Sequence, residues 1–218
     1  RNGRSLGQMA RRLLAAVPEL PRLRLSSLDP AAIDDDLWRL IASEPRLMPH
    51  LHLSMQAGSD LILKRMKRRH LRQQALDIIS RARALRPGIG IGADLIAGFP
   101  TETDDLFAET LAFVREAAIP FVHVFPYSER PGTPAARMPA VPVPVRRDRA
   151  AQLREAGAQA ARAFLAAQVG RTLSVLAETE TGGHSEHFAP VKVSATPGQL
   201  LAARVIAAND DHLLAEPA

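Results

Sequence analysis

Short apolar strand patterns alternate with amphipathic helix patterns through the first half of the chain. Strands are predicted at 23–26, 50–55, 89–97 and 121–125, and helices at 5–17, 30–41, 59–86 and 103–118. Strands joined through helices pair in parallel with right-handed crossovers. Four strands cannot close an eight-stranded barrel, and helix 5–17 has no strand before it. The expected fold class is therefore α/β, the C-terminal part of a (β/α) barrel that lacks its first strands.

The second half of the chain changes character twice. Residues 130–144 are rich in proline and predict an extended linker, and a long helix is predicted at 145–168. Short strands with Gly and Asn-Asp turns are then predicted at Thr172–Glu178, Ala189–Ser194, Leu200–Ala207 and His212–Ala215. We therefore expect a partial barrel at 1–138, a linker and helix at 139–168, and a small all-β barrel-like domain at 169–218.

Composition limits the partners and the chemistry. The net charge of +5 and the pI near 10.6 favour a polyanionic partner such as nucleic acid. The absence of cysteine excludes disulfides, thiolate nucleophiles and Cys-ligated metal within this chain. No apolar run of about 18 residues predicts a membrane span, and no apolar stretch of a signal peptide follows residues 1–4. A cytoplasmic location is expected.

Polar side chains stand near the ends of the first two predicted strands, and ligands bind at that end of parallel sheets. Arg24 and Ser26 belong to the first strand, and the guanidinium of Arg24 suits a ligand carboxylate. Gln56 offers a donor and an acceptor, as ribose hydroxyls or an amino-acid group require. The alternatives are an Arg24 bonded within the fold and an ordinary strand-to-helix turn at 54–59, where Ser59 caps the next helix.

The third predicted strand carries Asp94, Gly98 and Glu102. A carboxylate such as that of Asp94 in an apolar strand needs a partner or a ligand. Gly98 permits close backbone approach or unusual dihedrals. Glu102 complements a helix dipole, which is its structural alternative, and Thr101 is the expected cap of that helix. The loop at 126–133, with the only tyrosine of the chain, is a candidate for positioning substrate.

Two further groups are less specific. The histidines at 50, 52 and 123 have no evident carboxylate partner, so neither a metal site nor a catalytic residue is predicted from them. A basic run between 64 and 72 is suited to gripping phosphates, although a solvated helix face is the alternative, and no aromatic residue is present there for base stacking. The run consists of Lys64, Arg65, Lys67, Arg68, Arg69 and Arg72.

Five segments in this order resemble the radical S-adenosylmethionine (radical SAM) methylthiotransferase family: 23–30, 52–59, 64–68, 94–102 and 125–134. The sequence Arg-Leu-Ser-Ser-Leu-Asp-Pro at 24–30 and the sequence at 64–70 are most similar to those of the branch that acts on threonylcarbamoyladenosine in tRNA. The segment from about 169 is similar, more loosely, to the family's small RNA-binding β-barrel, called TRAM.

The resemblance implies a chemistry and a set of contacts. A 4Fe–4S cluster would cleave S-adenosylmethionine to a radical that takes hydrogen from adenine C2 beside the anticodon. A second cluster would help to deliver sulfur, and a second S-adenosylmethionine the methyl group. Arg24, Ser26 and Gln56 would lie near S-adenosylmethionine, and the segment from Asp94 through Gly98 to Glu102 would support its adenosine. The basic run and the β domain would hold the tRNA backbone.

The sequence departs from the family in having no cluster cysteines and no counterpart of the family's N-terminal region. We therefore expect a fragment that is inactive alone, with the clusters confined to the full-length enzyme. One alternative is a non-catalytic RNA-binding remnant. Another is a radical SAM enzyme with a different substrate, such as isopentenyladenosine or a ribosomal protein. A generic metabolic barrel enzyme is the least favoured, because no complete acid-base or metal set is present.

Overall fold

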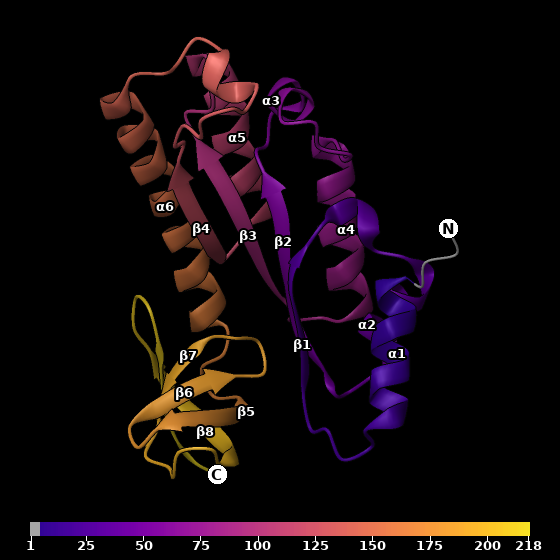
Figure 1. Ribbon diagram of the computed structural model, residues 1–218. Helices are drawn as coiled ribbons and strands as arrows, with labels where there is room; N and C mark the ends of the chain where they lie inside the picture. The colour runs from indigo at the N-terminus through magenta and orange to yellow at the C-terminus, as the bar shows by residue number, and fades with distance from the viewer. Residues whose placement is uncertain (1–4) are drawn as a thin grey trace.

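The computed structural model describes residues 5–218, which form a parallel sheet with helices followed by a small barrel (Figure 1). The expectation about a signal peptide at residues 1–4 lies outside the described residues. No helix within 5–218 is long and apolar enough to cross a membrane. The predicted fold class, part of a (β/α) barrel followed by a small all-β barrel, is confirmed.

The sheet has four parallel strands in the order β1-β2-β3-β4, and the barrel closes in the order β5-β6-β7-β9-β8. The sheet strands are β1 (Leu23–Leu28), β2 (Leu47–Gln56), β3 (Gly90–Ala97) and β4 (Phe121–Pro126). The barrel strands are β5 (Thr172–Thr179), β6 (Gly182–Ser185), β7 (Pro190–Lys192), β8 (Leu200–Ala208) and β9 (Leu213–Pro217). The α-helices are α1 (Leu6–Ala16), α2 (Asp35–Ser43), α3 (Asp60–Arg65), α4 (Arg72–Leu85), α5 (Asp104–Ala117) and α6 (Val143–Ala166).

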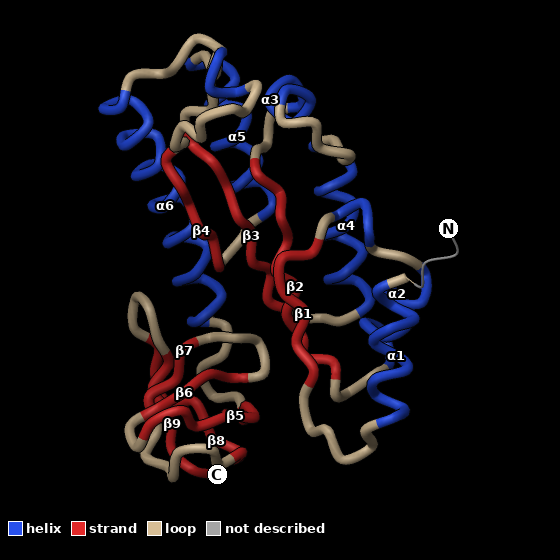
Figure 2. Tube along the Cα trace, in the orientation of Figure 1, coloured by secondary structure: helices blue, strands red, loops and turns tan. Residues whose placement is uncertain are grey.

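The helices cover one face of the sheet, as Figure 2 shows. Side chains alternate between the faces of a strand, and the odd-numbered residues of β2 and β3 face the helices. Leu51, Leu53, Ile91 and Leu95 are almost fully buried and belong to one core with Phe113 of α5. The even-numbered residues face the other side, and many of them are polar. The polar side chains of these strands thus lie on the face of the sheet that the helices leave free.

The predicted helix at 59–86 is broken into α3 and α4. The residues between them carry the middle of the basic run (Lys67, Arg68 and Arg69), and Lys67 adopts a left-handed φ of 56°. The break is fixed by polar contacts, because the backbone N–H of Arg72 donates to the Asp60 carboxylate at 2.6 Å. The buried ring of His70 also lies 3.2 Å from the carbonyl of Met55. These contacts come from residues that are distant in sequence or buried by tertiary packing, so helical periodicity does not reveal them.

Two predicted caps are displaced. Asp29 caps only the short 3₁₀ turn Pro30–Ala32, and Asp34 caps α2, where its carboxylate accepts from the Leu37 N–H at 2.8 Å. Thr101, the expected cap of the helix after β3, has a left-handed φ of 68°. Thr103 is the residue that caps α5. In both cases a second polar residue close by supplies the cap, and the first one shapes the turn before it.

The barrel has five strands where four were predicted. The missed strand, β6, has the sequence Gly-Gly-His-Ser, which carries no β-propensity signal. Its glycines are required by close packing, since a Cβ at Gly183 would collide with the backbone of Leu176 on β5. Strand pairing on both sides, and not side-chain preference, makes this segment a strand.

The barrel packs against the free face of the sheet near the amino ends of the strands. The guanidinium of Arg22 donates to the Ser174 carbonyl at 2.7 Å. The guanidinium of Arg24 lies 3.8 Å from the ring centroid of Phe188, and the same ring packs against His50. The barrel therefore covers the lower part of the face and leaves the carboxyl end open (Figure 1).

Acidification is expected to destabilise this packing through His50 and His187. Burial lowers the pKa of His50 to about 3 and the pKa of His187 to about 4. In the unfolded chain both groups bind a proton near pH 6.5. Stability is therefore lost as the pH falls from about 6.5 towards the folded values, by about 2 kcal/mol per histidine at pH 5.

Urea unfolding at pH 7 and pH 5 measures this effect. His50→Asn is expected to retain about half of the pH-dependent loss, since His187 still contributes. His212→Gln, at a partly exposed barrel position, is the matched control and should retain the full loss. An undiminished pH dependence in His50→Asn would contradict the assignment.

Candidate functional site

A cavity of about 560 Å³ opens at the carboxyl edge of the sheet. Its volume lies in the range of small-molecule sites. A second cavity of about 370 Å³ adjoins it and shares Gln56, Ile96, Thr133 and Ala135 with it. The residues that line the first cavity come from the ends of β2, β3 and β4 and from the loop after β4: Gln56, Asp94, Ile96, Phe125, Pro126, Tyr127, Ser128, Arg130, Thr133 and Ala135.

Gln56 ends β2 in a left-handed conformation, with φ at 69°. Such a conformation costs a residue with a side chain about 1–3 kcal/mol and persists only where the surroundings enforce it. Here the turn is tied to α5, because the Gly58 N–H donates to the Thr110 hydroxyl at 3.1 Å. Ser59 stands at the cap position of α3, but its buried hydroxyl has no partner within residues 5–218. The strained turn leaves the Gln56 side chain in the walls of both cavities.

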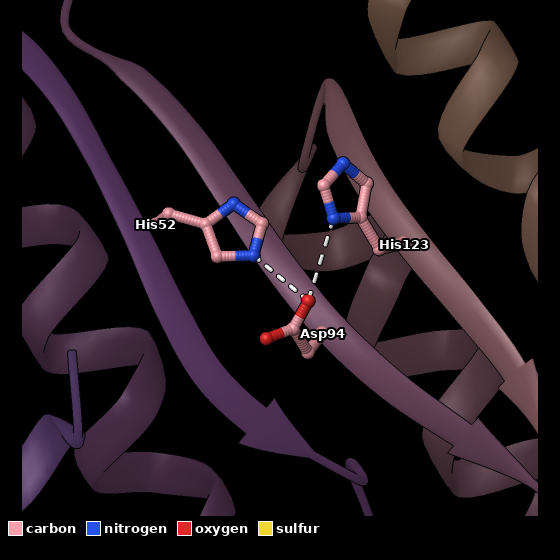
Figure 3. A group of neighbouring side chains, drawn as sticks. All are labelled: His52, Asp94 and His123. Carbon is pink, nitrogen blue, oxygen red and sulfur yellow. Dashed lines mark hydrogen bonds and ion pairs between the residues drawn. The ribbon is translucent and has the colours of Figure 1, made fainter. Parts of the chain in front are cut away.

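Asp94 also lines the first cavity, and it faces two histidines (Figure 3). Its Oδ1 lies 2.9 Å from Nε2 of His52 and 3.5 Å from Nδ1 of His123. The sequence suggested no carboxylate partner for these histidines, because it does not give the strand register. In the sheet Asp94 is paired directly with His123, and His52 with Gly92. The alternation of side chains along each strand, which marks one face as polar, was the one signal that could have found this group.

Tyr127 belongs to the loop that closes the cavity. Its N–H donates to the Ala97 carbonyl at 2.8 Å, and its carbonyl accepts from Arg146 at 3.0 Å. The ring packs edge-on against Phe99, with centroids 5.4 Å apart. The phenol oxygen is buried without a partner in the described chain. Buried polar groups are rarely left unpaired, so this hydroxyl is available to a ligand.

Arg24 and Ser26 do not line either cavity. Arg24 is the second residue of β1, near the amino end, and not at the carboxyl end where the sequence placed it. Its guanidinium is half-buried against Phe188 of the barrel, and its Nη1 has no hydrogen-bond partner in the described chain. Ser26 is exposed on β1, an edge strand of the sheet. The contact with the barrel fixes the position of the Arg24 side chain, and a local sequence pattern cannot predict that contact.

Gly98 and Glu102 lie beneath the cavity and are absent from its lining. The buried Glu102 carboxylate accepts from the Gly98 N–H at 2.8 Å and from Arg149 of α6 at 2.9 Å. Burial raises the pKa of Glu102, and the contacts with Gly98 and Arg149 oppose that rise. The pair joins the loop after β3 to α6, so in this structure Glu102 acts as a brace for the cavity floor.

Most of the basic run is held by partners within the protein. Arg65 donates to the Thr101 carbonyl and Arg68 to the Ser54 carbonyl. Arg69 and Arg72 pair with carboxylates of other elements. Two members of the run have no ion pair or side-chain hydrogen bond within residues 5–218: Lys64 and Lys67. Three members form a cationic wall of the second cavity: Arg65, Lys67 and Arg68.

Comparison with known proteins agrees with this arrangement. The profile of the Radical SAM superfamily matches residues 7–114, from α1 to α5. The chain is 46% identical over 211 residues to a threonylcarbamoyladenosine tRNA methylthiotransferase of Rickettsia prowazekii, covering 96% of this chain and 50% of the relative. It is 41% identical over 224 residues to a tRNA-2-methylthio-N(6)-dimethylallyladenosine synthase of Cereibacter sphaeroides, covering 99% of this chain and 51% of the relative.

The chain spans about half the length of these curated relatives. A synthase with the same name as the second, from Acidothermus cellulolyticus, is 45% identical over 166 residues, covering 76% of this chain and 33% of the relative. The matches extend over both the sheet and the barrel, and the superfamily profile covers β1, β2 and β3 of the sheet. The chain therefore belongs to the radical SAM superfamily, in its methylthiotransferase family.

Proposed function

We propose that this chain is the part of a tRNA methylthiotransferase that positions cofactor and substrate, and that the nucleoside modified is N6-threonylcarbamoyladenosine. The carrying observation is the cavity lined by Gln56, Asp94 and Tyr127 at the carboxyl edge of the sheet, where ligands of parallel α/β folds bind. The relative named for this nucleoside is 46% identical, against 41% for one named for dimethylallyladenosine. This protein would act in the cytoplasm.

The residues present fit S-adenosylmethionine but not an iron–sulfur cluster. The cavity has the volume of a small-molecule site, and its lining includes Tyr127, whose buried hydroxyl lacks a partner among the described residues. The chain has no cysteine, so it has no thiolate for a cluster, and the rest of the whole protein would carry the clusters. When bound, S-adenosylmethionine would supply the hydrogen-abstracting group that this superfamily uses.

Each residue of the cavity has a role that follows from its position. The Gln56 amide would donate to and accept from ribose or amino-acid groups, since it has both functions. The Tyr127 hydroxyl would donate to a second polar group of the ligand. Phe125 and Ile96 would exclude water from the apolar part of the wall. Gly98 and Glu102 would shape the floor of the cavity. Arg24 and Ser26, on β1, would not contact a ligand in the cavity directly.

We place the tRNA backbone at the second cavity and at the barrel. The free cations of Lys64 and Lys67, with the wall formed by Arg65 and Arg68, would attract phosphates. The remaining members of the run, Arg69 and Arg72, would contribute charge while bound to carboxylates. We divide the chain into a partial radical SAM barrel at 1–138, a linker and helix at 139–168, and a TRAM-like domain at 169–218.

Nucleoside mass spectrometry of total tRNA tests the proposal. A strain lacking the gene should lose the 2-methylthio form of threonylcarbamoyladenosine and accumulate the parent nucleoside. The whole gene should restore the modification, whereas Gln56→Ala in the whole gene should leave it at a small fraction of the restored level, because the cavity then loses a donor and an acceptor. Gln73→Ala is the matched control, since Gln73 bonds only Asp77 on the exposed face of α4.

Two results would contradict the proposal. An unchanged nucleoside profile in the deletion strain would refute the proposed tRNA methylthiotransferase function. Loss of the dimethylallyladenosine derivative alone would show that dimethylallyladenosine is the substrate. Full restoration of the modification by the Gln56→Ala gene would instead show that Gln56 in the cavity is not needed for the reaction.

A further inference from the structure

His52, Asp94 and His123 come from three neighbouring strands, β2, β3 and β4, and their side chains converge on the free face of the sheet (Figure 3). Each residue offers one ligand atom, and these three atoms lie within 4.8 Å of one another. The elements that carry them are hydrogen-bonded strands, so the backbone positions are rigid. Rigid placement of two imidazoles and one carboxylate is the arrangement that a transition-metal site requires.

The charge of Asp94 is not balanced by any lysine or arginine. Within residues 5–218 its only charged partners are the two imidazoles, although its side chain is only 21% exposed. Both rings approach the same oxygen, Oδ1, and Oδ2 points away from them (Figure 3). A partly buried carboxylate needs a compensating cation. Here that cation is either a protonated imidazole or a bound metal ion.

The surroundings leave room for the rings. A Cβ at Gly92 would collide with Nδ1 of His52, so the glycine creates the space in which this ring lies. His50, the next ring on the same face, lies 6.3 Å from His52 and stands apart from the group.

The distances fit a small divalent ion after modest movement. Bonds of about 2.0–2.2 Å to nitrogen and oxygen place ligand atoms about 3.3–3.6 Å apart at tetrahedral angles. The Asp94–His123 separation of 3.5 Å already satisfies this, and the Asp94–His52 hydrogen bond of 2.9 Å would open slightly. The His123 side chain is 56% exposed, so it is free to adjust and is accessible from solvent.

We propose that His52, Asp94 and His123 bind one divalent transition-metal ion, with Zn²⁺ as the preferred ion. Imidazole nitrogen and carboxylate oxygen suit Zn²⁺ better than Mg²⁺ or Ca²⁺. Three protein ligands leave one position open for water or a ligand group. Because Asp94 also lines the large cavity, that position adjoins the space assigned to the cofactor and substrate. The site is independent of cysteine, and it does not depend on the proposed activity.

Titration of the purified 218-residue chain with Co²⁺ and Zn²⁺ tests the site, because no thiolate contributes a background. We expect one equivalent of Co²⁺ to give visible absorption bands that Zn²⁺ removes. His123→Gln and Asp94→Asn should each weaken binding by at least about tenfold. His212→Gln is the matched control, because His212 pairs with Asp211 on the barrel outside this group, and it should bind as the parent does.

Thermal unfolding separates a lost site from a lost fold. Zn²⁺ should raise the Tm of the parent chain and not that of His123→Gln, while the two chains without metal should have similar circular dichroism spectra. Absence of a one-to-one Co²⁺ spectrum, or equal affinity in the parent and both variants, would overturn the proposal and leave a hydrogen-bonded cluster only.

Discussion

Replacing Arg149 with methionine is expected to lower the free energy of unfolding by about 3–5 kcal/mol, because it leaves the buried carboxylate of Glu102 unpaired. The Arg149 side chain is 6% exposed and that of Glu102 is fully buried. One guanidinium nitrogen donates to both the side chain and the backbone carbonyl of Glu102, each at 2.9 Å. Methionine fills a similar space without these donors. Urea unfolding at pH 8 measures the loss.

Two variants separate the buried pair from the surface contact of the same arginine. Asp104 also pairs with Arg149, but its side chain is 98% exposed, so Asp104→Ala should change stability little. Arg149→Met combined with Glu102→Gln should recover part of the loss, because no buried charge then remains. A loss in Arg149→Met no larger than that in Asp104→Ala would show that the buried pair does not hold the cavity floor.

The pH dependence of Arg149→Met gives an independent check. Burial already raises the pKa of Glu102 in the parent, and removal of the cation raises it further. The folded variant then binds a proton more tightly than the unfolded chain does, so its stability rises as the pH falls through the folded pKa. The defect should therefore be smaller at pH 5 than at pH 8. An equal defect at both values would point to lost packing and not to an unpaired charge.

The sequence located all four strands of the sheet because apolar patterning is a local property. The end of the second strand then suggested Gln56, and a carboxylate in an apolar strand suggested Asp94; both line the cavity. The register between strands is not local. The meeting of His52 with Asp94 depends on residues 42 positions apart, and nothing in either segment specifies it. The cavity was thus predictable as a location, whereas its polar cluster was not.

Inter-element contacts explain the other differences. Glu102 was expected to support a bound adenosine, with a helix-dipole role as the alternative, and its carboxylate is held by Arg149, which is 47 positions away. Arg24 read as a ligand residue at a strand end, but its guanidinium packs on Phe188 of the barrel. A basic run in sequence suggested a phosphate-binding surface, yet most of its arginines are bound to carbonyls and carboxylates of other elements. The sequence shows where charged residues occur, but tertiary packing decides which of those charges remain unpaired.

Substituting Gly98 with alanine is expected to destabilise the fold by about 2–5 kcal/mol, as the sum of left-handed strain of about 1–2 kcal/mol and overpacking of about 1–3 kcal/mol. Gly98 has a φ of 72°, and a Cβ there would lie 2.5 Å from Cγ of Arg146 and 3.1 Å from its Cα. Backbone contact at that distance leaves the helix little room to yield. Arg146 also holds the Tyr127 carbonyl, so the clash should disturb the cavity loop as well.

Gly132→Ala is the matched control, because Gly132 has a φ of 81° with nothing within 4 Å of a Cβ. It should show the conformational strain alone, about 1–2 kcal/mol, in the same urea unfolding experiment. The difference between the two variants then measures the contact between Gly98 and α6. If they lose equal stability, the glycine after β3 is needed only for its backbone conformation. A larger loss at Gly98 means that this glycine lets α6 approach the cavity floor, where Arg146 and Arg149 of that helix hold the loop and Glu102 in place.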